Sequence, residues 1–177
     1  GARTILICGG SQGALTMNQL LVDPVKKWAA AGIQVIWQTG SAGFESIREA
    51  MKEHSMVHCQ ESIPDLYPYY ALARVVIGRA GASTLSEAAL FGVPMVTLPL
   101  PWAAENHQWL NAGLAQDQGW VIRLDQQSVT AAQISGAVDP ILNDNSRHDA
   151  MHKQALHFSP ADAATQMVQR IKEEQKL

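Results

Sequence analysis

The chain has 177 residues, of which 47% are hydrophobic and 16% are charged, a composition typical of one compact globular domain rather than a disordered chain. Its net charge of −3 argues against the broad basic surface that nucleic-acid binding requires. No apolar stretch approaches the roughly 20 residues of a membrane-spanning helix. Cys8 and Cys59 each close an apolar run and are not spaced as metal ligands, which predicts buried free thiols in a reducing compartment.

Short apolar runs alternate with helical patterns along the chain. We expect strands at residues 3–8, 33–39, 56–60, 74–78, 94–100 and 120–124. We expect helices at residues 14–32, with a kink or restart at Pro24, at 44–54, 63–73 and 105–119, and from 128 onward, with breaks near 143–145 and 159–160. Strands rich in Val and Ile that alternate with helices predict an α/β fold with a Rossmann-like, doubly wound parallel sheet. No linker or internal repeat divides residues 1–177, so we expect a single domain.

The carboxyl ends of the strands are the expected ligand site, because open parallel sheets bind their ligands there. The first such loop reads "CGGSQGA" (Cys8–Ala14) and opens the first helix. Glycines bring bare backbone near a ligand, and helix-start amides attract anions, so an anion site is favoured over an ordinary tight turn. The loop lacks the Lys of a Walker motif, and the second strand ends "WQTG" without the acid of a dinucleotide fingerprint, so NAD is not expected.

The stretch "RAGASTLSE" (Arg79–Glu87) repeats this pattern after the fourth strand. Gly81 frees the backbone, and Ser83 or Thr84 can cap the helix that follows. Two helix starts that face one crevice could hold a diphosphate without a metal. The sequence has no Asp-x-Asp pair and no cluster of His and acids at ligand spacing, so no metal and no cofactor is expected.

Glu87 has two interpretations, which the pattern alone leaves open. In the first, Thr84 and Glu87 form a capping box, a purely structural role. In the second, Glu87 faces the crevice and its two oxygens accept hydrogen bonds from the vicinal hydroxyls of a ribose.

Polar side chains also follow the fifth strand, in "PWAAENHQWLNA" (Pro101–Ala112). His107, Gln108 and Asn111 bring donors and acceptors to a helix start, where they suit sugar hydroxyls. A lone histidine such as His107 is more often a surface or core residue than a catalytic one.

Several of these motifs together resemble the MurG family of glycosyltransferases. They are "GGSQGA" with Asn18 after it, "SIPDL" (Ser62–Leu66), "RAGASTLSE", "GVP" (Gly92–Pro94), "HQWLNA" and "SPADAATQMV" (Ser159–Val168), in the family's order. The resemblance implies the C-terminal half of a GT-B glycosyltransferase: one donor-binding domain over residues 1–177, with 160–176 as a closing C-terminal helix. The acceptor-binding N-terminal half of such enzymes, which carries the proposed general base, is not matched by this sequence.

The resemblance also implies roles for individual residues. Ser11 matches the serine on the diphosphate side of UDP-N-acetylglucosamine, Ile63 the residue whose backbone pairs with uracil, Glu87 the acid on the ribose hydroxyls, and Gln108 a glutamine on the sugar, with His107 and Asn111 beside it. Ala82, Ser83, Thr84, Leu85 and Ser86 match the segment around the phosphates and ribose. Gly10, Gln12, Gly13, Arg79 and Gly81 complete the expected donor site.

The function implied is the donor half of an inverting transferase that moves N-acetylglucosamine from UDP to lipid I, giving lipid II for peptidoglycan. The full-length enzyme would work at the cytoplasmic face of the bacterial inner membrane, without a membrane span in this half. We expect this chain to bind the donor but not to turn over lipid I alone. Alternatives are a non-catalytic donor-binding subunit that needs a partner chain, a UDP-N-acetylglucosamine 2-epimerase on the same fold, and a nucleotide-sugar binder without a transferase partner.

Overall fold

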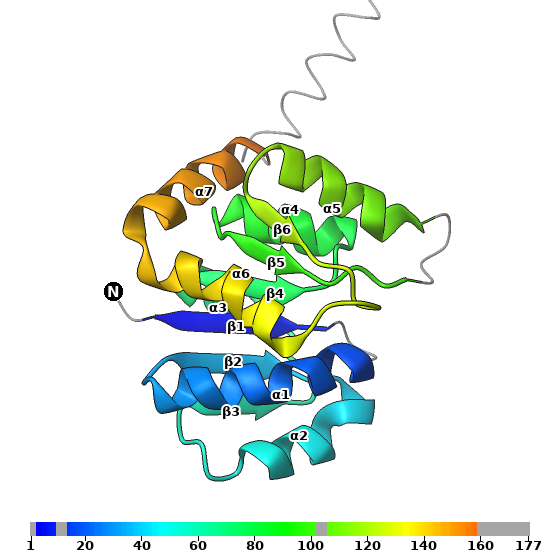
Figure 1. Cartoon of the computed structure of the whole chain (residues 1–177), viewed down its shortest axis with the longest axis vertical. Coiled ribbons are helices and arrows are strands. Elements are labelled where there is room, and N and C mark those ends of the chain that lie inside the picture. Colours follow the sequence, from blue (N-terminus) through cyan, green and yellow to red (C-terminus); the bar gives the residue numbers. More distant parts are fainter. Residues whose placement is uncertain (1–2, 10–13, 102–105, 159–177) are drawn as a thin grey trace, which may run out of the picture.

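The parallel sheet predicted from the sequence is present in the computed structural model, which describes residues 3–9, 14–101 and 106–158 (Figure 1). Its strands are β1 (Thr4–Cys8), β2 (Gln34–Gln38), β3 (Val57–Gln60), β4 (Val75–Gly78), β5 (Met95–Thr97) and β6 (Val121–Arg123). All neighbouring strands pair in parallel, in the order β3-β2-β1-β4-β5-β6. This order makes the sheet doubly wound, and it reverses between β1 and β4. The carboxyl ends at such a reversal are where open α/β sheets form their ligand-binding crevice.

Helices connect the strands and cover both faces of the sheet. They are α1 (Leu15–Ala30), α2 (Phe44–Met51), α3 (Tyr67–Leu72), α4 (Ala82–Leu90), α5 (His107–Asp117), α6 (Ala131–Asn143) and α7 (Asn145–Phe158), with a short 3₁₀ turn, η1 (Ser41–Gly43), before α2. The expected restart at Pro24 is wrong: α1 runs through the proline as one helix, with Pro24 buried on its packed face.

The third helix begins later than the pattern predicts, at Tyr67 instead of residue 63. Its start is fixed by Pro68, which favours the first turn of a helix, and by Asp65, whose carboxylate accepts a hydrogen bond from the Tyr67 N–H at 3.0 Å. Ile63 therefore lies in the loop between β3 and α3.

Alternate residues of the central strands pack into two separate hydrophobic cores, one on each face of the sheet. On β1, Ile5 and Ile7 join a cluster with α1, α2 and α6, while Leu6 and Cys8 join a second cluster with α3, α4 and α5. Figure 1 shows α1 and α6 in front of the sheet and α3 and α4 behind it. Cys8 is buried as predicted, whereas Cys59 is only half-buried, and both are free thiols.

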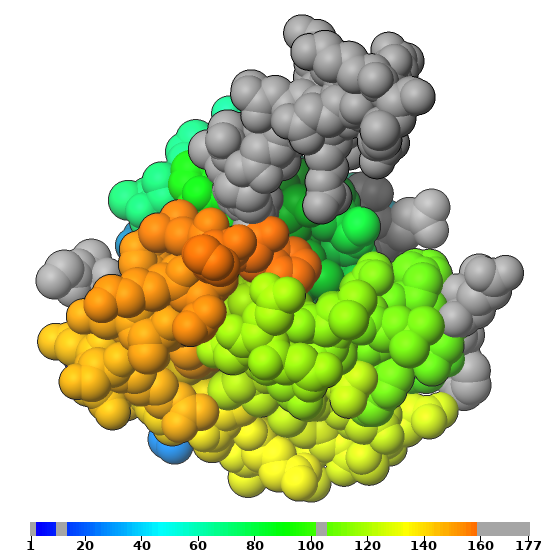
Figure 2. Space-filling view, turned by 90° about the horizontal axis from the view of Figure 1, so that it is seen from above, coloured from blue at the N-terminus to red at the C-terminus, as the bar shows by residue number. Residues whose placement is uncertain are grey.

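Helix α7 follows α6 directly after Asp144, at the break predicted near residues 143–145. Its last residue, Phe158, packs its ring on that of Trp120, with the centroids 5.0 Å apart. Figure 2 shows the surfaces of α5 and α7 side by side. The expected closing helix at 160–176 lies outside the described residues. Within the described ranges, no helix has the length and apolar character needed to cross a bilayer.

Asn18 fixes the start of α1 against the end of β2. Its side chain is 1% exposed, and both ends of its amide are used. The Nδ2 group donates to the carbonyl of Thr39 at 2.8 Å, and Oδ1 accepts from the indole N–H of Trp37 at 3.2 Å. This contact holds the carboxyl end of β2 against the start of α1.

Asn18→Leu is expected to lower the free energy of unfolding by about 2 kcal/mol, because it leaves the Trp37 N–H and the Thr39 carbonyl without this partner in a buried place. Urea unfolding followed by circular dichroism measures the change. Gln19→Leu, at the exposed neighbouring position of the same helix, is the control and should change stability by less than about 0.5 kcal/mol. Equal stabilities of the two variants would contradict the role given to Asn18.

Candidate functional site

The predicted donor-site residues that the structure describes lie in loops and helix starts that follow the carboxyl ends of β3, β4 and β5. They are Ile63, Arg79, Gly81, the first six residues of α4 from Ala82 to Glu87, and His107, Gln108 and Asn111 of α5. Gly10, Ser11, Gln12 and Gly13 lie outside the described residues. The described part of the predicted site therefore lies in the loops and helix starts after β3, β4 and β5.

The N-terminus of α4 is uncapped by any side chain. The helix begins at Ala82, and its N-cap is Gly81, in an extended conformation with φ −66° and ψ 147°. The expectation that Ser83 or Thr84 caps the helix is wrong, because both already lie within its first turn. The first amides of the helix have no intrahelical acceptor, and the Ala82 and Ser83 side chains are exposed. This end of α4 thus presents backbone donors and the positive end of the helix dipole to the crevice.

The start of α4 at Ala82 also excludes the predicted capping box between Thr84 and Glu87. A capping box needs its hydroxyl residue at the N-cap and its acid three positions later. Thr84 is the third residue of α4 instead, so Glu87 lies in the second turn with no cap to complete. A capping box is present elsewhere, between Thr130 and Gln133 at the start of α6. Glu87 is half-buried and available for another role.

Arg79 follows β4 directly and carries a half-buried charge. Its guanidinium donates to the carbonyl of Leu98, at the end of β5, which ties the two strand ends together. Burial lowers the pKa of Arg79 to about 10, so the side chain is still protonated at neutral pH. In the described part of the chain no carboxylate forms an ion pair with it. An anion in the crevice would compensate this charge.

Gln108 and Asn111 each use half of their amide to hold the loops together. The Gln108 Oε1 accepts a hydrogen bond from the Leu100 N–H at 2.9 Å, and the Asn111 Nδ2 donates to the carbonyl of Ala80 at 3.4 Å. Within the described chain, the NH₂ group of Gln108 and the carbonyl oxygen of Asn111 make no further hydrogen bond, so one residue can donate and the other accept. Together they can bind a ligand with hydroxyl groups, because Gln108 can donate a hydrogen bond to a hydroxyl and Asn111 can accept one from it. His107, the first residue of α5, is exposed.

The side chain of Ile63 is buried, while its backbone lies in the loop between β3 and α3. The side chain is 6% exposed and packs in the second core cluster, with Leu6 and Tyr70. Its N–H and carbonyl form no backbone hydrogen bond with any other part of the described chain. A residue of this kind can recognise a flat heterocycle through its main chain alone.

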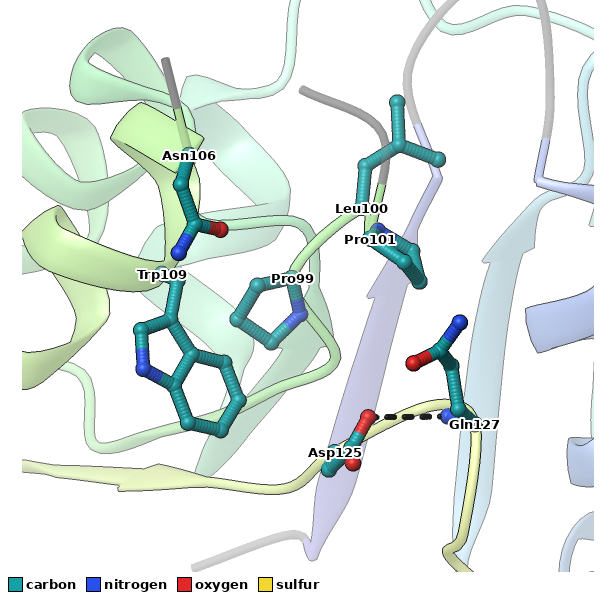
Figure 3. Close-up of a pocket in the computed structure, with 7 residues that line it drawn as sticks. All are labelled: Pro99, Leu100, Pro101, Asn106, Trp109, Asp125 and Gln127. Atoms are coloured by element: carbon teal, nitrogen blue, oxygen red, sulfur yellow. Dashed lines mark hydrogen bonds between the residues drawn. The ribbon is translucent and has the colours of Figure 1, made fainter. Parts of the chain in front are cut away.

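Two cavities flank α5. The smaller, of about 110 Å³, lies between α4 and α5 and brings together four predicted residues, Ala82, Leu85, Ser86 and Asn111, with Leu114 and Phe158. The larger, of about 300 Å³, lies beside the start of α5 and is drawn in Figure 3; it is lined by Pro99, Leu100, Pro101, Asn106, Trp109, Asp125 and Gln127. Sequence reasoning missed this second cavity.

The larger cavity combines apolar walls with polar groups, as small-molecule pockets do. Figure 3 shows Trp109 on one side of it, and Asp125 and Gln127, joined by a hydrogen bond of 2.9 Å, on the other. Arg123 lies 3.9 Å from the centre of the Trp109 ring and fixes the indole by a cation–π contact. Trp109 lies inside the "HQWLNA" motif, so its position was the signal that could have indicated the pocket.

No group of three or more His, Cys, Asp or Glu side chains gathers within the described ranges in a way that could hold a metal ion. Among the described residues, the site instead offers backbone amides at the start of α4 and several polar side chains. These side chains are Arg79, Ser83, Thr84, Ser86, Glu87, His107, Gln108 and Asn111. A doubly wound parallel sheet with helices on both faces and polar groups at its carboxyl edge defines the class of Rossmann-like α/β domains.

Within that class, the chain belongs to the glycosyltransferase family 28 C-terminal domain, which its sequence matches over residues 4–167. It is 33% identical over 169 residues to the UDP-N-acetylglucosamine–N-acetylmuramyl-(pentapeptide) pyrophosphoryl-undecaprenol N-acetylglucosamine transferase of Desulfotalea psychrophila, covering 93% of this chain and 46% of that protein. The enzyme of the same name from Nitratidesulfovibrio vulgaris is 34% identical over 173 residues, which cover 97% of this chain and 47% of that protein. The chain spans about half the length of these relatives.

Solved structures share the same fold. The crystal structure of Acinetobacter baumannii MurG superposes with a TM-score of 0.79 at 26% identity, and covers 98% of this chain and 50% of that one. The glycosyltransferase VinC, solved in complex with dTDP, superposes with a TM-score of 0.69 at 18% identity, over 98% of this chain and 42% of that one, and supports the fold alone. The predicted fold class, the C-terminal half of a GT-B glycosyltransferase, is confirmed.

Proposed function

We propose that this chain is the UDP-N-acetylglucosamine-binding domain of an inverting glycosyltransferase that converts lipid I to lipid II. The observation that supports the proposal is the start of α4 at the carboxyl edge of a family 28 domain, where no side chain caps the first amides. Arg79 precedes this helix start, and Glu87 lies in its second turn. The relatives whose sequences match over nearly the whole chain carry this activity in their names.

Each part of the donor has a matching group in this proposal. The amides that open α4, with Arg79 and with Ser11 from the first loop, bind the diphosphate. The Glu87 carboxylate accepts from the two ribose hydroxyls, and the Ile63 backbone pairs with uracil. Gln108 donates to the sugar and Asn111 accepts from it. His107 lies beside them at the start of α5.

The chemical role of this half is to stabilise the leaving group. When the acceptor hydroxyl attacks the anomeric carbon, negative charge builds on the departing diphosphate. Amides and an arginine that are already oriented toward that charge lower the barrier, because they need no reorganisation as it forms. They also hold the anomeric carbon in place for attack. The general base that takes the proton of the acceptor hydroxyl comes from the acceptor-binding half of the enzyme, as does the contact with lipid I at the inner face of the membrane.

A direct test compares donor binding with turnover. Residues 1–177 act as one donor domain in this proposal, so the chain alone should bind UDP-N-acetylglucosamine in calorimetric titration but form no lipid II from lipid I. Adding an acceptor-binding half from a relative, as a fusion or in trans, should restore product formation measured with radiolabelled donor. Failure to bind any UDP-sugar would refute the proposal, and lipid II synthesis by the chain alone would refute the division of labour.

Arg79→Gln is expected to weaken the binding of UDP about tenfold, while the binding of uridine stays unchanged, because the guanidinium acts on the diphosphate. Arg74→Gln is the matched control: Arg74 lies at the other end of β4 and binds the Ile141 carbonyl and Asn145 instead. Titration calorimetry with the two ligands measures the effect. Equal losses for UDP and uridine, or for both variants, would show that Arg79 acts only through the fold.

A further inference from the structure

The hydroxyl of Tyr70 is buried without a hydrogen-bond partner in the described part of the chain. Tyr70 lies on α3 and is 1% exposed, in the core cluster that also contains Cys8 and Ala88. A buried hydroxyl that makes no hydrogen bond costs free energy, on the order of 1–3 kcal/mol, so a phenylalanine would fit the core better. The position of this hydroxyl therefore calls for a functional reason.

The ring of Tyr70 is aligned with one face of α4. It stacks on Phe91 at the end of that helix, with the ring centroids 5.9 Å apart and the planes 14° apart. Glu87 precedes Phe91 by four residues, so the two lie one turn apart on the same face of α4. Tyr70 thus packs along the face of α4 that carries Glu87. Its hydroxyl is near enough to the Glu87 carboxylate and the Cys8 thiol of β1 to interact electrostatically with both.

The Tyr70 hydroxyl and the Cys8 thiol both keep their protons near neutral pH. Burial, with the nearby Cys8 and Glu87, raises the pKa of Tyr70 far above its usual range. Burial raises the pKa of the Cys8 thiol to about 12, although the contact with Tyr70 opposes this shift. The Tyr70 hydroxyl is therefore a permanent donor, and the only carboxylate acting on it in the described chain is that of Glu87.

We propose that Tyr70 is a positioning residue for Glu87: its hydroxyl donates to the inner oxygen of the carboxylate and aims the remaining lone pairs at the ribose diol. This inference rests on the proposed function, in which Glu87 binds that diol. In this proposal the hydrogen bond forms when the donor nucleotide fixes the Glu87 side chain. It gives an acceptor to a buried hydroxyl that has no hydrogen-bond partner in the described chain.

The test measures UDP and 2′-deoxyuridine diphosphate binding by calorimetry on wild type, Tyr70→Phe, Glu87→Ala and the double variant. Tyr70→Phe is expected to weaken UDP binding about tenfold, to reduce the preference for UDP over the deoxynucleotide, and to leave the melting temperature unchanged or higher. In the Glu87→Ala background, the same substitution should have no further effect. Tyr67→Phe is the matched control, since Tyr67 is also on α3 and also contacts Phe91, but is 52% exposed.

The outcomes separate this inference from the function on which it rests. If Glu87→Ala leaves UDP affinity unchanged, the ribose site itself is wrong. If Glu87→Ala weakens binding but Tyr70→Phe behaves as Tyr67→Phe does, the donor site stands and the positioning role is overturned. Equal losses from Tyr70→Phe with and without Glu87 would also overturn it, as would a lower melting temperature without any change in nucleotide preference.

Discussion

Glu87→Ala is expected to weaken UDP binding by about 10- to 150-fold without lowering the melting temperature of the free chain. A hydrogen bond to a charged group contributes about 1.5–3 kcal/mol, and the carboxylate accepts from the ribose hydroxyls in our account. Stability should not fall, because Glu87 caps no helix: α4 begins at Ala82 with Gly81 as its N-cap. A half-buried carboxylate that no cation pairs with in the described chain contributes little to folding.

Titration calorimetry with UDP and a thermal melt of each variant measure the two quantities. Asp117→Ala is the control for charge, because it makes the same change in net charge at an exposed position in the last turn of α5. It should alter neither the affinity nor the melting temperature. A Glu87→Ala variant with wild-type affinity and a lower melting temperature would contradict our account, and would give the acid a purely structural role.

Gly78→Ala is expected to lower the free energy of unfolding by about 3 kcal/mol, the largest stability effect that we predict. A Cβ at this position would lie 2.6 Å from the carbonyl oxygen of Cys8 and 3.1 Å from its sulfur. Gly78 is the register partner of Cys8 across β1 and β4, so the sheet backbone itself must shift to admit a methyl group. The shift would occur where both strands lead into donor-site loops, so nucleotide affinity should fall as well.

Gly136→Ala provides the opposite case in the same protein. Gly136 lies within α6, where an added Cβ would meet no atom within 4 Å. Alanine in a helix interior is more stable than glycine by about 0.5–1 kcal/mol, so this variant should be stabilised. Urea unfolding of the two variants tests both predictions, a lower free energy of unfolding for Gly78→Ala and a higher one for Gly136→Ala. Similar small changes for both would show that the close approach of β1 and β4 relaxes at little cost.

Local patterns were sufficient to predict the sheet, because parallel strands buried on both faces appear in the sequence as continuous apolar runs. Their ends were predicted less well, since flanking apolar residues are buried too. The run at residues 94–100 forms a strand only from Met95 to Thr97. Leu98 is fully buried beyond it, and Pro99 and Pro101 have no N–H to continue a ladder.

The start of α4 shows where pattern reasoning fails. "GASTLSE" offers Gly81, Ser83 and Thr84 as N-cap residues for α4, and serine has the highest N-cap preference of these types. The chain uses Gly81 instead, which leaves the helix end open toward the crevice. The proposed site needs uncapped amides, which conflicts with the local preference for a capping side chain, and sequences break local rules most often at functional sites.

Other features depend on contacts between segments that only the fold brings together. The Arg79 bond to the Leu98 carbonyl, the use of half of each amide in Gln108 and Asn111, and the approach of Tyr70 to Glu87 are of this kind. The residue types were visible in the sequence, but their partners lie 8 to 31 residues away. The predicted roles of these residues toward a donor stay predictions, as does that of Ser11.

The central claim is that backbone amides and fixed side chains at this edge bind the donor diphosphate without a divalent ion. Calorimetric titration of UDP-N-acetylglucosamine into the chain, in buffer with EDTA and again with excess Mg²⁺, tests it most directly. The account predicts one-to-one binding in EDTA, with an affinity that Mg²⁺ leaves unchanged. Binding that is absent in EDTA and appears only with Mg²⁺ would contradict it.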